Sequence, residues 1–204
     1  MSLYQNKYRI ESTRLKNWDY SANGYYFITI CTDNMQKIFG KVIDGKMVLS
    51  DVGKIVESEL LKSFEIRAEL FCEIYCVMPN HIHVLVQIEN VNEEMHGSVS
   101  EQHGSASVTI NNNIFLADGF NKNISAKADK KYGVAYRVPK SISSFVAGFK
   151  SSATKKINEF RNTPKLPVWQ ERFHDHIVRN EEEFNRIRMY IKNNPLKWEK
   201  DKCK

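Results

Sequence analysis

The sequence has little of what a secreted or membrane-embedded protein needs. It holds four cysteines in 204 residues, none in a Cys-x-x-Cys pair, so we expect buried free thiols rather than a cysteine-based framework. No apolar run approaches the roughly 20 residues of a membrane span. The first residues lack the apolar core of a signal peptide. We therefore expect a cytoplasmic protein without a membrane partner, folded as a single domain over residues 1–204.

The net charge is distributed unevenly along the chain. Residues 1–89 carry 10 Lys and Arg against 11 Asp and Glu, and residues 90–139 carry 5 of each. Residues 140–204 carry 15 against 8, so the excess positive charge lies in the last third. This asymmetry favours a polyanionic partner contacted by the C-terminal region, although a solvated basic surface would produce the same count.

Apolar periodicity predicts strands and helices in alternation. The expected elements are a strand at 25–32, a hairpin at 38–49, a helix after Ser50 or Asp51, strands at 71–77 and 81–88, a helix at 141–161, and a last helix from Asn180 to Asn194. Between them, residues 90–139 are rich in Asn, Ser and Gly and show little periodicity. We interpret this stretch as a long, partly flexible insertion, and we do not expect its His96 and His103 to bind metal.

The most informative segment is Met78-Pro79-Asn80-His81-Ile82-His83, which opens a strand-like apolar run. Side chains alternate between the two faces of a strand, so His81 and His83 should project together while Ile82 points into the core. Two imidazoles on one rigid face make half of a metal site. A second histidine pair, His174 and His176, lies in no clear strand, and we expect it to serve packing or hydrogen bonding.

The last helix carries two polar residues on one edge, Tyr190 and Asn194. Phe184, Ile187 and Ile191 form its buried stripe, and Tyr190 is rotated by roughly 120° from Phe184, beside that stripe. Asn194 lies one turn after Tyr190 on nearly the same line. If this edge faces the sheet, two imidazoles and the Asn194 oxygen could bind a divalent cation next to the tyrosine hydroxyl.

That combination suits phosphodiester cleavage. A tyrosine hydroxyl is a weak nucleophile near neutral pH, and a cation on the scissile phosphate would offset this weakness by stabilising the developing charge. Attack by the tyrosine would release a 3′-OH and leave a 5′-phosphotyrosine linkage. A second strand could later attack this linkage, which gives strand transfer without an external energy source.

The same motifs resemble those of the HUH nucleases, named for a histidine pair around a hydrophobic residue. Three segments are similar to motifs of the REP-associated tyrosine transposases, relatives of the small single-tyrosine insertion-sequence transposases. They are the histidine motif, the stretch that contains Trp169-Gln170, His176 and Arg179-Asn180, and residues Tyr190 to Pro195. The resemblance covers about residues 10–90 and 140–198. It implies an α+β fold with a ferredoxin-like antiparallel β-sheet and helices packed on one face.

The resemblance also implies roles for individual residues. Tyr190 would be the nucleophile, His81, His83 and Asn194 the metal ligands, and Mg²⁺ or Mn²⁺ the cofactor. The substrate would be single-stranded DNA beside a hairpin, and we expect a monomer rather than a homodimer. The basic residues within or beside the motifs are candidates for DNA contacts: Arg14, Lys16, Lys150, Lys155, Lys156, Arg172 and Arg179.

Two other functions remain open at this point. The chain could be a catalytically idle hairpin-binding protein derived from a transposase, or a metal-dependent hydrolase that uses water in place of tyrosine. Tyr132 and Tyr136, in the insertion, are rival nucleophiles only in principle.

Overall fold

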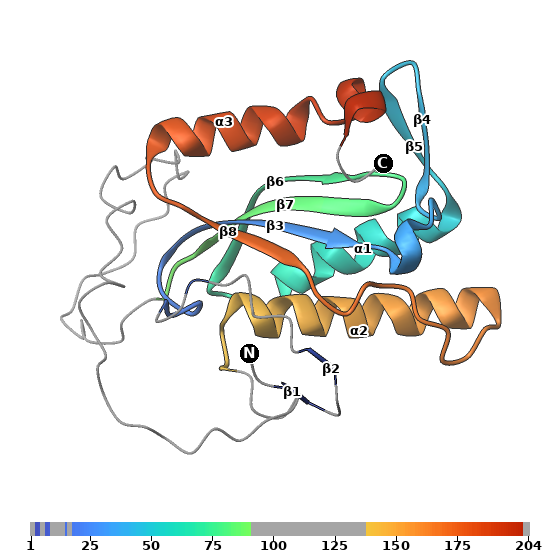
Figure 1. The fold of residues 1–204 in the computed structure, drawn as a ribbon, viewed down its shortest axis with the longest axis horizontal. Helices are drawn as coiled ribbons and strands as arrows, with labels where there is room; N and C mark the ends of the chain where they lie inside the picture. Colours follow the sequence, from blue (N-terminus) through green and yellow to red (C-terminus); the bar gives the residue numbers. More distant parts are fainter. Residues whose placement is uncertain (1–2, 5–6, 9–14, 16–17, 91–137, 202–204) are drawn as a thin grey trace, which may run out of the picture.

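The computed structural model describes residues 3–4, 7–8, 15, 18–90 and 138–201 (Figure 1). The predicted insertion therefore lies almost wholly outside the described residues, as do Arg14, Lys16, Tyr132, Tyr136 and the two histidines of the insertion.

A four-stranded antiparallel sheet forms the centre of the molecule. Its strands are β3 (Gly24–Cys31), β6 (Leu70–Val77), β7 (His81–Ile88) and β8 (His174–Val178), and their spatial order is β6-β7-β3-β8. Helix α1 (Asp51–Glu65) connects β3 to β6, and α2 (Ile142–Arg161) lies between β7 and β8 in the chain. This βαββαβ succession, with the first and third strands central, is the ferredoxin-like arrangement, so the predicted α+β fold class is confirmed (Figure 1).

The sheet is covered on both faces. Alternate residues of β3 and β7, such as Ile28 and Val84, join α1 and α2 in the larger apolar core. The other face carries a smaller cluster in which Tyr25 and Leu85 pack against α3 (Glu181–Lys192). The expectation that helices pack on one face is therefore correct for α1 and α2 but wrong for α3. The physical reason is that β3 and β7 are central strands whose two faces both carry apolar side chains, and both need cover.

The helix starts follow the predicted caps. The Ser50 side chain accepts a hydrogen bond from the Gly53 amide, and Asn180 accepts one from the Glu183 amide. Helix α3 ends at Lys192, close to the predicted end. Asn194 nevertheless has helical dihedral angles (φ −58°, ψ −44°), because it begins the 3₁₀ helix η4 (Pro195–Lys200). The residue before Pro195 thus keeps helical geometry, although the residue before a proline usually adopts an extended conformation.

A short 3₁₀ helix and a β-hairpin lie between β3 and α1 in the chain. The predicted hairpin is present as β4 (Gly40–Ile43) and β5 (Lys46–Leu49), with positive φ at both Asp44 (49°) and Gly45 (70°). The short 3₁₀ helix η1 (Asp33–Met35) follows β3. Near the amino terminus, the two-residue strands β1 (Leu3–Tyr4) and β2 (Lys7–Tyr8) pair with each other.

The cysteines of the described part are free thiols, as predicted. Cys31 is buried, and Cys72 and Cys76 are half-buried. Burial disfavours the thiolate and raises the pKa of Cys72 to about 12 and that of Cys76 to about 11. No helix among the described residues is long and apolar enough to cross a membrane.

A buried carboxylate joins the two helices of the larger core. The Glu59 side chain of α1 is 5% exposed and receives Lys156 Nζ of α2 at 2.6 Å, together with a short hydrogen bond from Ser152 Oγ. These contacts lower the pKa of Glu59 against the opposing effect of burial. A depressed carboxyl pKa stabilises the fold above the unfolded value of 4.5, and this contribution is lost as the pH falls through the folded value.

We expect Glu59→Ala to lower the free energy of unfolding by about 1–3 kcal/mol, because it leaves Ser152 and Lys156 without their acceptor. Urea unfolding at neutral pH measures this loss. The matched control is Asp51→Ala, which removes an exposed ion pair with Lys54 and should cost under about 1 kcal/mol. Equal losses in the two variants would contradict the account.

Candidate metal and nucleophile site

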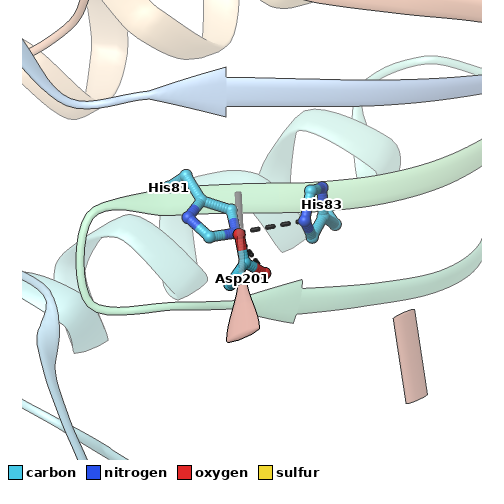
Figure 2. A group of neighbouring side chains, drawn as sticks. All are labelled: His81, His83 and Asp201. Atoms are coloured by element: carbon cyan, nitrogen blue, oxygen red, sulfur yellow. Dashed lines mark hydrogen bonds and ion pairs between the residues drawn. The ribbon is translucent and has the colours of Figure 1, made fainter. Parts of the chain in front are cut away.

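The two histidines of the motif lie together at the start of β7. Both are buried on the sheet face covered by α3, and the side chain of Ile82 between them enters the larger core. Their Nε2 atoms are 3.0 Å apart (Figure 2). The prediction that the pair projects on one face is confirmed.

Each ring is oriented through its other nitrogen. His81 Nδ1 lies 2.8 Å from the Asn80 side-chain oxygen, which can only accept, so Nδ1 carries the proton and Nε2 the lone pair. His83 Nδ1 lies 2.8 Å from the Thr29 hydroxyl, which can accept its proton in the same way. With this tautomer both Nε2 lone pairs face the same small space, an arrangement typical of histidines that share a cation.

Burial favours the neutral form of both imidazoles. It lowers the pKa of His81 to about 4, although the nearby Asp201 carboxylate acts in the opposite direction. It lowers the pKa of His83 well below 6.5, and the neighbouring His81 adds to this effect. Near neutral pH protons therefore do not compete for the two Nε2 lone pairs.

The chain after α3 adds two oxygen-bearing side chains. Asp201 Oδ2 lies 4.0 Å from His81 Nε2, and ligand atoms of His81, His83 and Asp201 all lie within 4.8 Å of one another (Figure 2). Asn194 donates through Nδ2 to Asp201 Oδ2 at 2.8 Å. Its Oδ1 is buried and makes no hydrogen bond within the described part of the chain.

This donor set fits a divalent cation. Imidazole nitrogens with carboxylate and amide oxygens suit first-row metals such as Mn²⁺, and an orphaned buried oxygen is costly unless something coordinates it. Asp201 is a candidate that the sequence did not suggest. Asn194, expected as the third ligand, holds the Asp201 carboxylate, and that carboxylate lies 4.0 Å from His81 Nε2.

Tyr190 lies against the histidine pair. Its hydroxyl is 3.2 Å from His83 Nε2, and its ring meets Phe27 edge-on with centroids 6.0 Å apart. The Tyr190 residue is 41% exposed. The helix edge predicted to carry Tyr190 and Asn194 therefore faces the two histidines.

Sequence reasoning missed three residues around the histidines. Asn80 and Thr29 orient the rings, and Asp201 supplies a carboxylate. Asn80 directly precedes the histidine pair and could have been noticed as a candidate to orient it. Neither Thr29 nor Asp201 has a local signal, because strand pairing and the turn of η4 bring them to the site.

Strand β8 is a further difference from the sequence analysis. Its polar start, His174-Asp175-His176, conceals a strand that pairs with β3. His176 Nε2 lies 2.9 Å from Glu183 Oε1, in agreement with the expected hydrogen-bonding role.

The basic candidates that the structure describes lie on α2 and on either side of β8. Lys150 Nζ donates to the carbonyl oxygen of Gln170 at 2.7 Å, and Lys156 forms the ion pair with Glu59 described above. Lys155 lies 4.0 Å from Glu159 and is exposed, as are Arg172 and Arg179. The three lysines lie on α2, which covers the face opposite to the histidines.

Lowering the pH is expected to destabilise the metal-free protein between about pH 6.5 and 4. His81 binds its proton with a pKa of about 4 in the folded state and 6.5 in the unfolded state. Below pH 6.5 the unfolded chain takes up a proton that the folded chain refuses, so the free energy of unfolding falls until folded His81 titrates as well. Urea unfolding in a chelator at several pH values measures this slope.

A variant carrying both His81→Asn and His83→Asn should lose this part of the pH dependence and keep the part due to Glu59, which begins near pH 4.5. Identical slopes for the variant and the wild type would show that these histidines are not buried in the neutral form.

Comparison with known proteins gives the context of this site. No known family model matches the chain. It is 29% identical over 194 residues to an uncharacterized protein of Haemophilus influenzae, an alignment that covers 93% of this chain and 90% of the relative. Among solved structures it is similar to a REP-associated tyrosine transposase bound to a REP hairpin, with a TM-score of 0.54 and 14% identity, over 92% of this chain and 74% of the other. The chain therefore has the fold of a REP-associated tyrosine transposase, and the resemblance predicted from its motifs is confirmed at the level of the fold.

Proposed function

We propose that the protein is a metal-dependent tyrosine transposase, which cleaves single-stranded DNA and transfers the strand through a 5′-phosphotyrosine intermediate. One observation carries the proposal: the Tyr190 hydroxyl lies 3.2 Å from Nε2 of His83, whose partner His81 is 3.0 Å away. A nucleophile beside two neutral imidazole ligands is what tyrosine-based phosphodiester cleavage requires.

In the proposed reaction the Tyr190 oxygen attacks the scissile phosphorus. A new O–P bond forms to the tyrosine, whose hydroxyl releases its proton, while the P–O3′ bond breaks and the departing 3′ oxygen takes up a proton to become a free 3′-OH. The phosphate stays joined to the 5′ end of the downstream strand and to Tyr190. The reverse attack by another 3′-OH joins strands and releases the enzyme.

The surrounding residues prepare Tyr190 for this attack. The edge-on contact with Phe27 would hold the ring, and the substrate would approach Tyr190 from its exposed side. His81, His83 and the oxygens of Asn194 and Asp201 would hold Mg²⁺ or Mn²⁺. The cation would act as a Lewis acid on the scissile phosphate.

We further propose that the DNA is a hairpin with a single-stranded flank. The solved structure similar to this chain holds a REP hairpin, and the last third of this chain is basic. The exposed arginines that flank β8, Arg172 and Arg179, would contact the flank, and Lys155 and Lys156 on α2 would contact the stem. Arg14, Lys16 and Lys150 remain candidates for the same role.

A monomer is the proposed active form. All five side chains of the candidate site come from one chain: His81, His83, Tyr190, Asn194 and Asp201.

The experiment that tests the function incubates the protein with hairpin oligonucleotides that carry single-stranded flanks, in Mn²⁺ or Mg²⁺. We expect a covalent protein–DNA species on a denaturing gel and a released fragment with a free 3′-OH. Tight hairpin binding without any covalent species would instead identify an idle binding protein.

A further inference from the structure

We propose that His174 binds the DNA backbone next to the scissile phosphate, as a substrate-positioning residue on the open part of the sheet. This inference rests on the proposed function and deepens it by assigning the path of the single strand away from Tyr190.

Strand register brings His174 into line with the candidate metal site. Thr29 on β3 is the partner of His83 on one side and of His174 on the other. Residues paired directly across antiparallel strands point to the same face, and the Thr29 hydroxyl contacts His83 on the face that Tyr190 covers. His174, Thr29 and His83 therefore form one row across three strands on that face.

The distance between His174 and His83 excludes His174 as a ligand of the same cation. Two strand spacings separate His174 from His83, roughly 10 Å in the backbone, whereas a metal–nitrogen bond is about 2 Å long. The Thr29 side chain also lies between them. His174 is thus placed for a group that extends from the metal site, such as the next phosphate of a bound strand, rather than for the cation itself.

His174 is exposed, and no helix of the described residues covers it. Helix α3 packs on β6 and β7 and leaves the start of β8 exposed, and Figure 1 shows β8 at the far edge of the sheet from β6. Within the described residues, no hydrogen bond or ion pair engages the His174 ring. An imidazole N–H can donate to a phosphate oxygen, and its ring can stack on a base.

The chain provides a matched control in His176. It lies two residues later on the same strand and face, and it is exposed too, but Glu183 holds its Nε2 at 2.9 Å. An imidazole already engaged by a carboxylate is a poor ligand for an anionic strand. His174 and His176 are therefore matched in residue type, strand and face. They differ in whether the imidazole ring is available to bind DNA.

The test measures binding of a fluorescent hairpin with a single-stranded flank in a chelator, so that no cleavage occurs. We expect His174→Ala to weaken binding about tenfold, as the loss of one hydrogen bond to a charged group would. His176→Ala should bind like the wild type, and His174→Arg should restore binding. A hairpin without the flank should bind His174→Ala and the wild type equally.

Unchanged affinity of His174→Ala for the flanked hairpin would overturn the inference, as would an equal loss for the hairpin without a flank. Mn²⁺ binding, followed by thermal unfolding, should be the same in His174→Ala and the wild type. A loss there would place His174 in the metal site instead. A different measurement reports failure of the proposed function: the wild type would then form no covalent adduct in Mn²⁺, whatever the result for His174.

Discussion

Replacing Tyr190 with phenylalanine is expected to lower covalent adduct formation by more than about a thousandfold, to background. The substitution removes the one oxygen that would attack phosphorus and keeps the ring that packs edge-on against Phe27. The lost hydrogen bond to His83 lies at a half-exposed position, so the free energy of unfolding should fall by no more than about 1 kcal/mol. A denaturing gel with a labelled flanked hairpin in Mn²⁺ measures the adduct.

Tyr75→Phe is the matched control for this variant. Tyr75 is also a half-buried tyrosine with a hydrogen-bonded hydroxyl, but it contacts Glu57 on the other face of the sheet. It should form the adduct at the wild-type rate. Continued cleavage by Tyr190→Phe, with a 5′-phosphate in place of the protein link, would identify water as the nucleophile and the protein as a hydrolase.

Replacing His81 or His83 with asparagine should lower covalent adduct formation by a similar factor, through loss of the cation rather than of the nucleophile. Each substitution removes one of the two lone pairs that face the same space, 3.0 Å apart, and so should abolish Mn²⁺ binding. In the wild type, Mn²⁺ at 100 times its dissociation constant should stabilise the fold by about 2.7 kcal/mol. Thermal unfolding with and without Mn²⁺ should show this rise in the wild type and no rise in either variant.

Because both histidines are buried, a variant could lose activity simply by unfolding. The complementary experiment uses the wild type alone: a chelator should abolish adduct formation, and added Mn²⁺ should restore it. His176→Ala provides a control for histidine loss outside the site and should keep the response to Mn²⁺. Adduct formation that persists in the chelator would rule out a cation as part of the reaction.

The residues that local rules govern were predictable from the sequence. The period of two along a strand placed His81 and His83 together, and the helical period placed Tyr190 and Asn194 on one edge. The cap at Asn180 fixed the start of that helix. What the sequence alone left conditional was whether the edge faces the histidines, because more than 100 residues separate them.

The remaining features depend on long-range pairing. Asp201 reaches the site because η4 turns the chain back toward His81, and no pattern in the sequence signals that turn. Strand β8 was missed because Asp175, which pairs with Ile28 and so points to the side of the larger core, is polar and breaks the alternation that a half-covered strand would show. The position of α3 on the second face likewise follows from the apolar side chains on both faces of the central strands.

The central claim is that Tyr190 itself becomes linked to DNA. Trapping the adduct with a flanked hairpin in Mn²⁺, digesting both protein and DNA, and mapping the modified peptide by mass spectrometry tests it most directly. The account predicts one modified site, a 5′-nucleotide phosphate on the Tyr190 oxygen. Modification of another residue, such as Tyr132 or Tyr136, would contradict it.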